Sequence, residues 1–394
     1  MLAVTTATQA LTTLGALALA AVAPKAAQDL GVSAALIGYQ VGAIFFSAML
    51  SALVGGALVR RLGAMRTSQL ALALAAAGCA LSALGTLATL AAGALVMGLG
   101  YGMTNPAASH LLSRAPSARH MNLLFSLKQS GVPIGGVLAG LLVPPVALGL
   151  GWRAALAACA LALGVFAIAS EGARRRWDDD REPGAPLLAG PAASLALVWA
   201  NPVLRWLAGA SFLYSAVQLC LTGFLVTYLV AEVGLELVLA GSILALTHAA
   251  GAFGRLAWGW LADRLRSGTR ALIALGAMSV LGALVTAAIH EGWPTPLVAA
   301  AAALFGFSAM GWNGVFMAII ARQSPGRISM ATGGSLAVTY AGVVAGPAAF
   351  GALHDRAGLS YGGGFALLAL LALAGLACVA ISRSRSLRAA AVRG

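Results

Sequence analysis

Two basic residues lie in stretches of sequence that are otherwise apolar. They are Lys128, and Arg255, which precedes Asp263 by eight residues, or about 12 Å of helix. None of the eleven acidic residues falls well inside such a stretch. A charge placed in an apolar setting costs roughly 2.5 to 3.5 kcal/mol or more, so it is expected to face protein or water. Two fixed positive charges without a negative one favour an anionic ligand, in particular a carboxylate.

Each of these residues also has a structural interpretation. Lys128 could be bonded across helices to residues such as Asn105, and Arg255 could extend to the membrane interface or donate to carbonyls of a broken helix. His248 precedes Arg255 by seven residues and shares its helix face. If the activity of the protein involves proton exchange, His248 is the best titratable candidate; a neutral packing role is equally open.

Other polar and aromatic residues in the apolar stretches complete the predicted substrate site. Asn105 and Asn313 are favoured among them, because they lie beside Pro106 and Gly314, which we expect to break their helices. The predicted substrate-binding set is Lys128, Arg255, His248, Asn105, Asn313, Tyr101, Trp312, Tyr340, Gln129 and Tyr39. Further polar candidates are Gln9, Thr12, Gln40, Tyr214, Gln218 and Thr339.

The elements that carry these residues are predicted to be membrane-spanning helices. The 394 residues are 60% hydrophobic and 9% charged, and their mean hydropathy of +0.92 lies far outside the range of soluble proteins. Apolar stretches of about 20 residues, the length that crosses a bilayer as a helix, recur along the chain. The predicted fold is an all-α membrane protein whose spans lie near 5–24, 34–59, 67–88, 91–113, 121–147, 152–170, 203–230, 237–261, 270–290, 296–321, 328–353 and 362–382.

The twelve spans divide into two halves of six. Residues 1–170 form the first half, and residues 203–394 form the second half with a short basic tail. Between them, residues 171–202 combine a run of charges with a stretch rich in Pro and Gly, which is typical of a solvated linker.

The distribution of Lys and Arg predicts the orientation in the membrane. Nineteen of the 24 lie on one side of the predicted spans and only Lys25, Arg153 and Arg356 lie on the other. The cytoplasmic loops of membrane proteins hold the excess of positive charge. Both termini and the linker are therefore expected in the cytoplasm, and the protein itself in the inner membrane. This arrangement also accounts for the net charge of +13 without nucleic-acid binding.

The two halves are predicted to be sequence repeats. Gly56 and Arg61 lie 203 residues before Gly259 and Arg264, and Gly38 lies 203 before Gly241. In the fourth helix of each half, Gly98, Asn105, Arg114 and Arg119 lie 208 residues before Gly306, Asn313, Arg322 and Arg327. Duplicated six-helix halves of the same topology are a transporter architecture in which substrate binds near the midplane.

Three motifs resemble those of the major facilitator superfamily. Gly259-Trp-Leu-Ala-Asp263-Arg264 is similar to that family's loop signature between helices 8 and 9. The segment from Gly56 to Gly63 resembles the same signature between helices 2 and 3, with Arg60 in place of Asp, and Ser130 to Gly136 is similar to the glycine and proline motif of helix 5. The resemblance implies a conformational latch made of Gly56, Arg61, Gly259, Asp263 and Arg264, in which Asp263 faces a helix N-terminus.

The resemblance also bears on function. In oxalate:formate antiporters and monocarboxylate transporters, an arginine of helix 8 binds the substrate carboxylate, and Arg255 is similar in position. The expected function is therefore secondary active or exchange transport of a small organic anion by alternating access, in a monomer that requires the lipid bilayer, with protons or a counter-anion as coupling species. The alternatives are an inorganic-anion or cyanate-like porter, a drug efflux protein of the same superfamily, and a sensor with a transporter fold.

The sequence does not predict an enzyme. It contains no Walker A, His-Glu-x-x-His or Gly-x-Ser-x-Gly motif and no pair of carboxylates within a span. The four cysteines have no ligand-like spacing and are interpreted as packing residues. No cofactor and no metal are expected.

Overall fold

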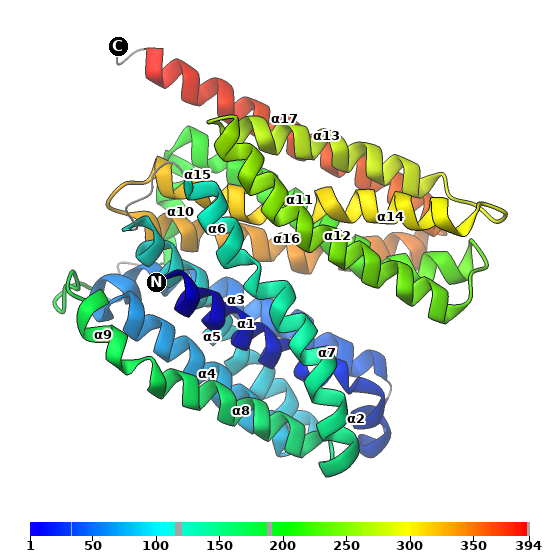
Figure 1. The fold of residues 1–394 in the computed structure, drawn as a ribbon, viewed down its shortest axis with the longest axis horizontal. Coiled ribbons are helices and arrows are strands. Elements are labelled where there is room, and N and C mark those ends of the chain that lie inside the picture. Colours follow the sequence, from blue (N-terminus) through cyan, green and yellow to red (C-terminus); the bar gives the residue numbers. More distant parts are fainter. Residues whose placement is uncertain (33, 115–119, 187–190, 392–394) are drawn as a thin grey trace. The chain divides into compact units, whose positions relative to one another are not determined.

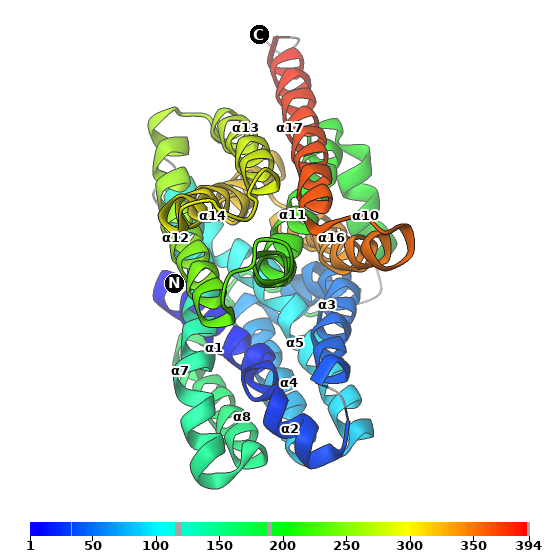
Figure 2. The same cartoon turned by 90° about the vertical axis from the view of Figure 1, so that its right-hand side faces the viewer.

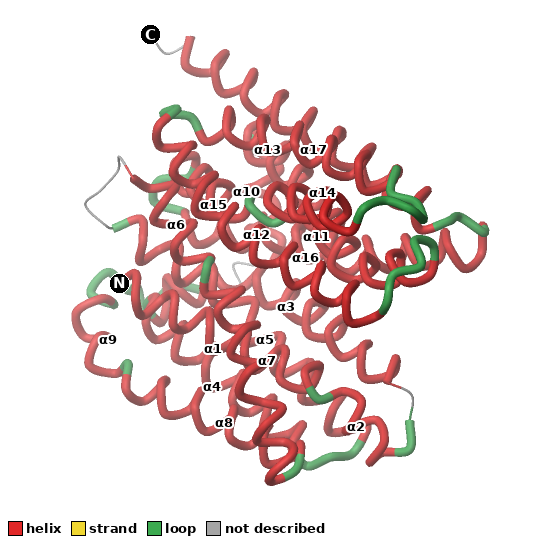
Figure 3. Tube along the Cα trace, turned by 45° about the vertical axis from the view of Figure 1, so that its right-hand side comes forward, coloured by secondary structure: helices red, strands yellow, loops and turns green. Residues whose placement is uncertain are grey.

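The structure is a computed structural model that describes residues 1–32, 34–114, 120–186 and 191–391. Within these ranges it describes all side chains except those of residues 24, 34–39, 191, 237–238 and 389–391. Every regular element in the described part is an α-helix, and short loops join the helices (Figure 3). Of the residues named in the sequence analysis, Arg119 lies outside the described residues, as does the side chain of Tyr39.

The helices form two compact units. Unit 1 comprises Met1–Pro116, Lys128–Val198 and Ser324–Ala337, and unit 2 comprises Ser117–Leu127, Trp199–Gln323 and Val338–Gly394. The chain therefore crosses between the units not only in the linker but also within the fifth and eleventh predicted spans. A short piece of each sequence half belongs to the unit built mainly from the other half.

Unit 1 is a bundle in which α4 lies between α5 and α8, while α3 packs on α5 and α1 packs on α7 (Figure 1). Small residues allow these helices to approach closely: a Cβ added to Gly102 of α5 would lie 2.2 Å from the carbonyl oxygen of Ala48 in α3. Its helices are α1 (Leu2–Ala21), α2 (Ala23–Leu30), α3 (Ala34–Leu62), α4 (Ala64–Ala83), α5 (Leu87–Ser113), α7 (Gly131–Leu150), α8 (Trp152–Ala169), α9 (Glu171–Trp177) and α10 (Pro191–Ala200).

In unit 2, α17 packs on α11 and α13, and α12 packs on α14 (Figure 2). Its core contains Phe305 and Phe365, whose ring centroids lie 6.5 Å apart. The helices are α11 (Pro202–Ala231), α12 (Leu237–Arg264), α13 (Gly268–Ala287), α14 (Thr295–Ala309), α15 (Asn313–Gln323), α17 (Tyr361–Ala391), most of α6 (Met121–Gln129) and the second part of α16 (Ile328–Ala357).

The long helices confirm the predicted twelve-helix fold. Eleven segments of the described chain are long and apolar enough to cross a membrane, and α12 is a further helix of 28 residues. Two of the eleven are composite: α6 and α7 together form the span Met121–Leu150, and α14 and α15 form Thr295–Gln323. Each of the eleven segments, and α12, matches a predicted range to within several residues.

Several local predictions were wrong. Pro106 does not break its helix, because it lies inside the continuous α5. Gly314 lies within α15, and the interruption of that span occurs earlier, at residues 310–312, between α14 and α15. The short helices α2, α9 and α10 were not predicted, and α9 and α10 place helical structure in the segment that was interpreted as a solvated linker.

Candidate functional site

The charged side chain of Lys128 is buried in unit 1 among amide groups. It is 2% exposed, and its Nζ donates to Gln9 Oε1 of α1 at 2.7 Å, to Asn105 Oδ1 of α5, and to Gln129 Oε1 at 3.2 Å. An ammonium has three N–H donors, so these three oxygens can satisfy all of them. The contacts of Lys128 therefore include the one expected of a structural lysine, a hydrogen bond across helices to Asn105.

Further polar groups surround this cluster. The hydroxyl of Thr104 donates to Gln9 Oε1 at 3.4 Å, and Gln9 Nε2 donates to Thr13 Oγ1 at 3.5 Å. Tyr101, one turn before Asn105 on α5, is buried and packs edge-on against Phe45 with ring centroids 5.7 Å apart. The predicted residues Lys128, Asn105 and Gln129 thus meet in one place, and Gln9 is their common partner.

A second polar cluster forms in unit 2 where α14 ends and α15 begins. Gln218 of α11 accepts through Oε1 from Trp312 Nε1 at 3.1 Å and from Asn313 Nδ2 at 3.4 Å. Trp312 lies in the interruption and Asn313 is the first residue of α15, so both belong to a broken span. Discontinuous helices of this kind line substrate sites in transporters.

Arg255 of α12 reaches the same interruption. It is buried, and its Nε donates to the carbonyl oxygen of Met310 at 3.1 Å. Trp258, three residues later, donates through Nε1 to the carbonyl oxygen of Phe307 at 3.2 Å. The break leaves carbonyls without their usual helical partners, and Arg255 and Trp258 of α12 supply donors to two of them. His248, on the same helix, has an exposed side chain.

Parts of the two clusters occupy repeat-related positions. Asn105 and Asn313 are 208 residues apart. Gly131 and Gly135 recur 211 residues later as Gly342 and Gly346, so Lys128 corresponds to Thr339, whose hydroxyl donates to Ser211 Oγ at 2.8 Å. Gln9 packs on Gly131 and Ser215 packs on Gly342, so the repeat equivalent of Gln9 is Ser215 and not Gln218. The charge is therefore present in the first cluster and absent from the matching position of the second.

The carboxylate of Asp263 caps the first turn of α6. It accepts from the backbone N–H of Asn122 at 3.2 Å, from Asn122 Nδ2 at 2.7 Å and from the backbone N–H of Leu123 at 2.8 Å. A negative group at a helix N-terminus satisfies free N–H groups and interacts favourably with the helix dipole. Gly259, one turn earlier, permits this contact, because a Cβ there would lie 2.4 Å from Ser126 Oγ.

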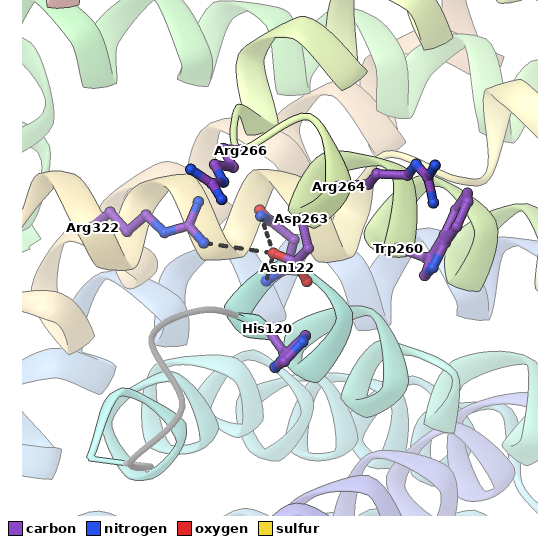
Figure 4. Close-up of a pocket in the computed structure, with 7 residues that line it drawn as sticks. All are labelled: His120, Asn122, Trp260, Asp263, Arg264, Arg266 and Arg322. Carbon is purple, nitrogen blue, oxygen red and sulfur yellow. Dashed lines mark hydrogen bonds and ion pairs between the residues drawn. The ribbon is translucent and has the colours of Figure 1, made fainter.

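Asp263 and three arginines line a cavity of about 750 Å³. Figure 4 shows the side chains of Arg264, Arg266 and Arg322 at this cavity. Arg322 of α15 lies nearest to Asp263, at 3.7 Å. Arg264, the neighbour of Asp263 in sequence, points toward Trp260, with its guanidinium carbon 5.4 Å from the ring centroid. The predicted latch residues Gly259 and Asp263 thus both lie against α6, and Arg322, which was not among the predicted latch residues, forms an ion pair with Asp263. The remaining residues of the cavity wall are His120, Asn122 and Arg266.

The matching segment of the first half is built differently. Arg60 is the repeat equivalent of Asp263. It forms an ion pair with Glu182 of the linker at 2.7 Å. Arg61 is exposed at the end of α3. Gly56 of α3 packs so closely on the start of α16 that an added Cβ would lie 2.5 Å from Met330 Cα.

In this part of the first half, the carboxylates come from residues of the linker. Asp178 is buried and accepts from the backbone N–H groups of Met65 and Arg66, at 2.6 and 2.9 Å, in the first turn of α4. Burial raises the pKa of the Asp178 carboxyl, although both N–H bonds oppose the shift. The Arg114 guanidinium lies 2.7 Å from the Asp179 carboxylate and lowers the pKa of Asp179. The linker therefore caps α4 as a structural part of unit 1.

The remaining predicted residues are placed as follows. Tyr340 is buried in α16 within unit 2. The side chain of Tyr39 lies outside the described residues. Among the described residues, no group of three or more His, Cys, Asp or Glu side chains could hold a metal ion.

The eleven described segments that could cross a membrane, the 28-residue α12 and the buried polar clusters define a multi-pass α-helical membrane protein of the transporter class. The chain belongs to the Major Facilitator Superfamily, whose family model matches residues 5–325. This family and its fold are those of membrane transporters and not of enzymes.

The most similar proteins agree with this assignment. An MFS-type transporter of Gibberella moniliformis is 30% identical over 246 residues, which are 61% of this chain and 56% of that relative. This chain thus matches little more than half of the relative's length. Among solved structures, the E. coli fucose:proton symporter FucP has a TM-score of 0.78 at 16% identity, covering 98% of both chains. The human organic anion transporter MFSD10 has a TM-score of 0.78 at 17% identity, covering 96% of this chain and 98% of its own. At such identities the likeness concerns the fold alone.

Proposed function

We propose that this protein transports a small organic anion, with a carboxylate as the preferred class, across the cytoplasmic membrane. The observation that carries the proposal is the sign of the buried charge. Lys128 and Arg255 are buried within the described spans, and both are cations. The buried carboxylates of the described residues lie elsewhere: Asp178 is in the linker, and Asp263, whose side chain is 7% exposed, is in the last turn of α12. A low-dielectric site with positive charge favours an anion over a neutral or cationic ligand.

Arg255 is the residue best suited to contact the substrate carboxylate. A guanidinium presents five N–H donors in a planar fork that matches the two oxygens of a carboxylate. Its Nε bond to Met310 holds the side chain at the interruption between α14 and α15, beside Trp312 and Asn313. Lys128 is a second buried positive charge, in unit 1.

Transport by alternating access fits the division of the sequence into halves, 1–170 and 203–394, with residues 171–202 between them and both termini in the cytoplasm. In this proposal Asp263 and Gly259 form the latch: the carboxylate holds the first turn of α6 in one conformation of the cycle and releases it in the other. The coupling species is a proton or a counter-anion.

The fold itself accommodates different cargo classes, since one protein of similar fold is named as an organic anion transporter and another as a fucose:proton symporter. In this proposal, the sign of the buried charge decides between these classes of cargo. A cationic drug would require the opposite sign in the site, and a neutral sugar would require no buried cation.

The proposal can be tested by uptake into proteoliposomes. The panel would contain labelled lactate, oxalate and benzoate, with lactamide as the neutral analogue of lactate and choline as a cation. We expect carboxylate uptake, and a reduction of about tenfold or more in Arg255→Ala, because a hydrogen-bonded charge pair contributes roughly 1.5 to 3 kcal/mol. Arg356→Ala, an exposed arginine at the end of α16, is the control and should retain uptake.

Two results would contradict the proposal. Uptake of lactamide or choline that equals carboxylate uptake and is unaffected by Arg255→Ala would remove the argument from charge. Binding of a carboxylate to purified protein without any flux would support a sensor instead.

A further inference from the structure

Among the described residues, the Lys128 ammonium bonds to amides and to no carboxylate. All three oxygens around Nζ belong to amides, those of Gln9, Asn105 and Gln129. The described helices that meet there carry few ionisable groups. In α1 and α7 the sequence has none, α6 has only Lys128, and α5 has Tyr101 and His110. His110 lies five residues beyond Asn105 and is 2.7 Å from Asp180 of the linker.

A buried lysine without a counter-ion is not explained by packing. An ammonium in an apolar setting is unfavourable by several kcal/mol, whereas a methionine of similar length would fill the same space without a charge. A permanent positive charge is also better supplied by arginine, as at Arg255, because arginine does not lose its proton in proteins. Lysine is the basic side chain that can exist in both forms.

The amide environment can satisfy both forms of the side chain. The ammonium donates three hydrogen bonds to three oxygens. The neutral amine donates two and accepts one on its lone pair, and a side-chain amide can rotate to offer an N–H in place of its oxygen. Carboxylates could not do so, because an ionised carboxylate only accepts. Three amides therefore leave no buried group unsatisfied in either form.

Lys128 lies where the chain passes from one unit to the other. This passage from unit 2 to unit 1 falls between Leu127 and Lys128, and α6 gives way to α7 at Ser130. In the second repeat the corresponding passage, between Ala337 and Val338, is followed by Thr339, which has no charge. The charge at this place is therefore a feature of the first repeat only.

We infer that Lys128 is the proton-coupling residue of this transporter and carries one proton in each cycle. One N–H bond of the ammonium breaks, its electron pair stays on Nζ as the lone pair, and the proton leaves to water on one side of the membrane. The reverse step takes a proton from water on the other side. This inference rests on the proposed transport function and assigns the proton to Lys128 in place of His248.

The sequence permits a direct test, because Lys25 and Lys128 are its only lysines. Protein labelled with ¹³C and ¹⁵N in lysine and placed in lipid nanodiscs should give two side-chain NMR signals, and Lys25→Arg identifies the signal of Lys128. We expect this signal to change from ammonium to amine between about pH 5 and 8, the range of physiological proton transfer. A Lys128 signal that stays in the ammonium form throughout that range overturns the inference.

Asn105→Asp is the matched variant, since it places an acceptor-only carboxylate where the amide was. The Lys128 signal should then remain that of an ammonium over the same range. If the Lys128 signal in Asn105→Asp changes with pH as it does in the unchanged protein, the argument from the amides is wrong.

Transport separates this inference from the proposed function. With a pH gradient across proteoliposomes, the protein should accumulate labelled lactate at least tenfold above equilibrium, and Lys128→Arg should abolish that accumulation. Accumulation that persists in Lys128→Arg overturns the inference. A protein that moves no carboxylate, but whose Lys128 signal titrates as expected, would overturn the proposed function and leave the proton site supported.

Discussion

At the scale of the residue, two glutamines organise the buried polar groups. Gln9 accepts from Lys128 and Thr104, and Gln218 accepts from Trp312 and Asn313. Both use one amide oxygen to join residues of different helices. Because buried donors are expensive to leave without an acceptor, each glutamine stabilises the cluster that it joins.

Replacing Gln218 tests this role. Gln218→Leu removes the acceptor of the buried Trp312 Nε1 and should lower the free energy of unfolding by about 1 to 3 kcal/mol. Gln218→Glu keeps two acceptor oxygens at nearly the same volume and is expected to be closer to the parent protein. Thermal unfolding in detergent, followed by tryptophan fluorescence, would measure both. Equal melting temperatures for Gln218→Leu and the parent would show that the glutamine does not stabilise the cluster.

At the scale of the element, the interruption between α14 and α15 depends on close packing. A Cβ at Gly311 would lie 2.4 Å from Trp258 Cδ1 and 3.0 Å from the carbonyl oxygen of Phe307. The same carbonyl accepts from Trp258 Nε1. Glycine at 311 therefore lets α12 approach the broken span closely enough for Trp258 and Arg255 to reach its carbonyls.

Gly311→Ala should consequently destabilise the protein by about 1 to 3 kcal/mol, the usual cost of forcing extra volume into a packed site. Gly223→Ala in α11 is the matched control, because a Cβ there meets nothing within 4 Å, and alanine is intrinsically the better helix former. Melting temperatures measured side by side would compare the two. A destabilised Gly223→Ala with an unaffected Gly311→Ala would contradict the packing argument.

At the scale of the whole molecule, each unit combines segments from both halves of the sequence. The first turns of α6 belong to unit 2, where Asp263 caps them, and the start of α16 belongs to unit 1, where it packs on Gly56. The capping carboxylate is present only in the second repeat, because the first repeat has Arg60 at that position. The latch proposed for the transport cycle is therefore expected to be asymmetric.

Asp263→Asn tests the asymmetric latch. The amide keeps one acceptor oxygen but loses the charge and the second acceptor, so the conformation with α6 capped should lose about 1 to 3 kcal/mol, equivalent to a 5- to 150-fold change in the populations. Accessibility of cysteines introduced on each side of the membrane would report the shift. Asp355→Asn, an exposed residue at the end of α16, is the control. Unchanged accessibility in Asp263→Asn would exclude the latch.

The sequence by itself determined the spans, because crossing a bilayer requires a continuous apolar stretch and this property is local. The prediction of 152–170, for example, corresponds to α8 at Trp152–Ala169. The sign of the buried charge was predictable for the same reason, since Lys128 and Arg255 are visible as basic residues in apolar surroundings. The family motifs likewise lie in short continuous segments.

Only the tertiary structure decided which groups meet. Pro106 was expected to break α5 and does not, whereas the tenth span breaks at 310–312, where Gln218, Trp258 and Arg255 from other helices supply the missing partners. The capping of α4 by Asp178 joins residues more than 100 positions apart, so no local pattern indicated it. Hydropathy is a property of consecutive residues, but hydrogen bonding in a bundle is decided between helices, and that is why the clusters around Gln9 and Gln218 emerged only from the folded chain.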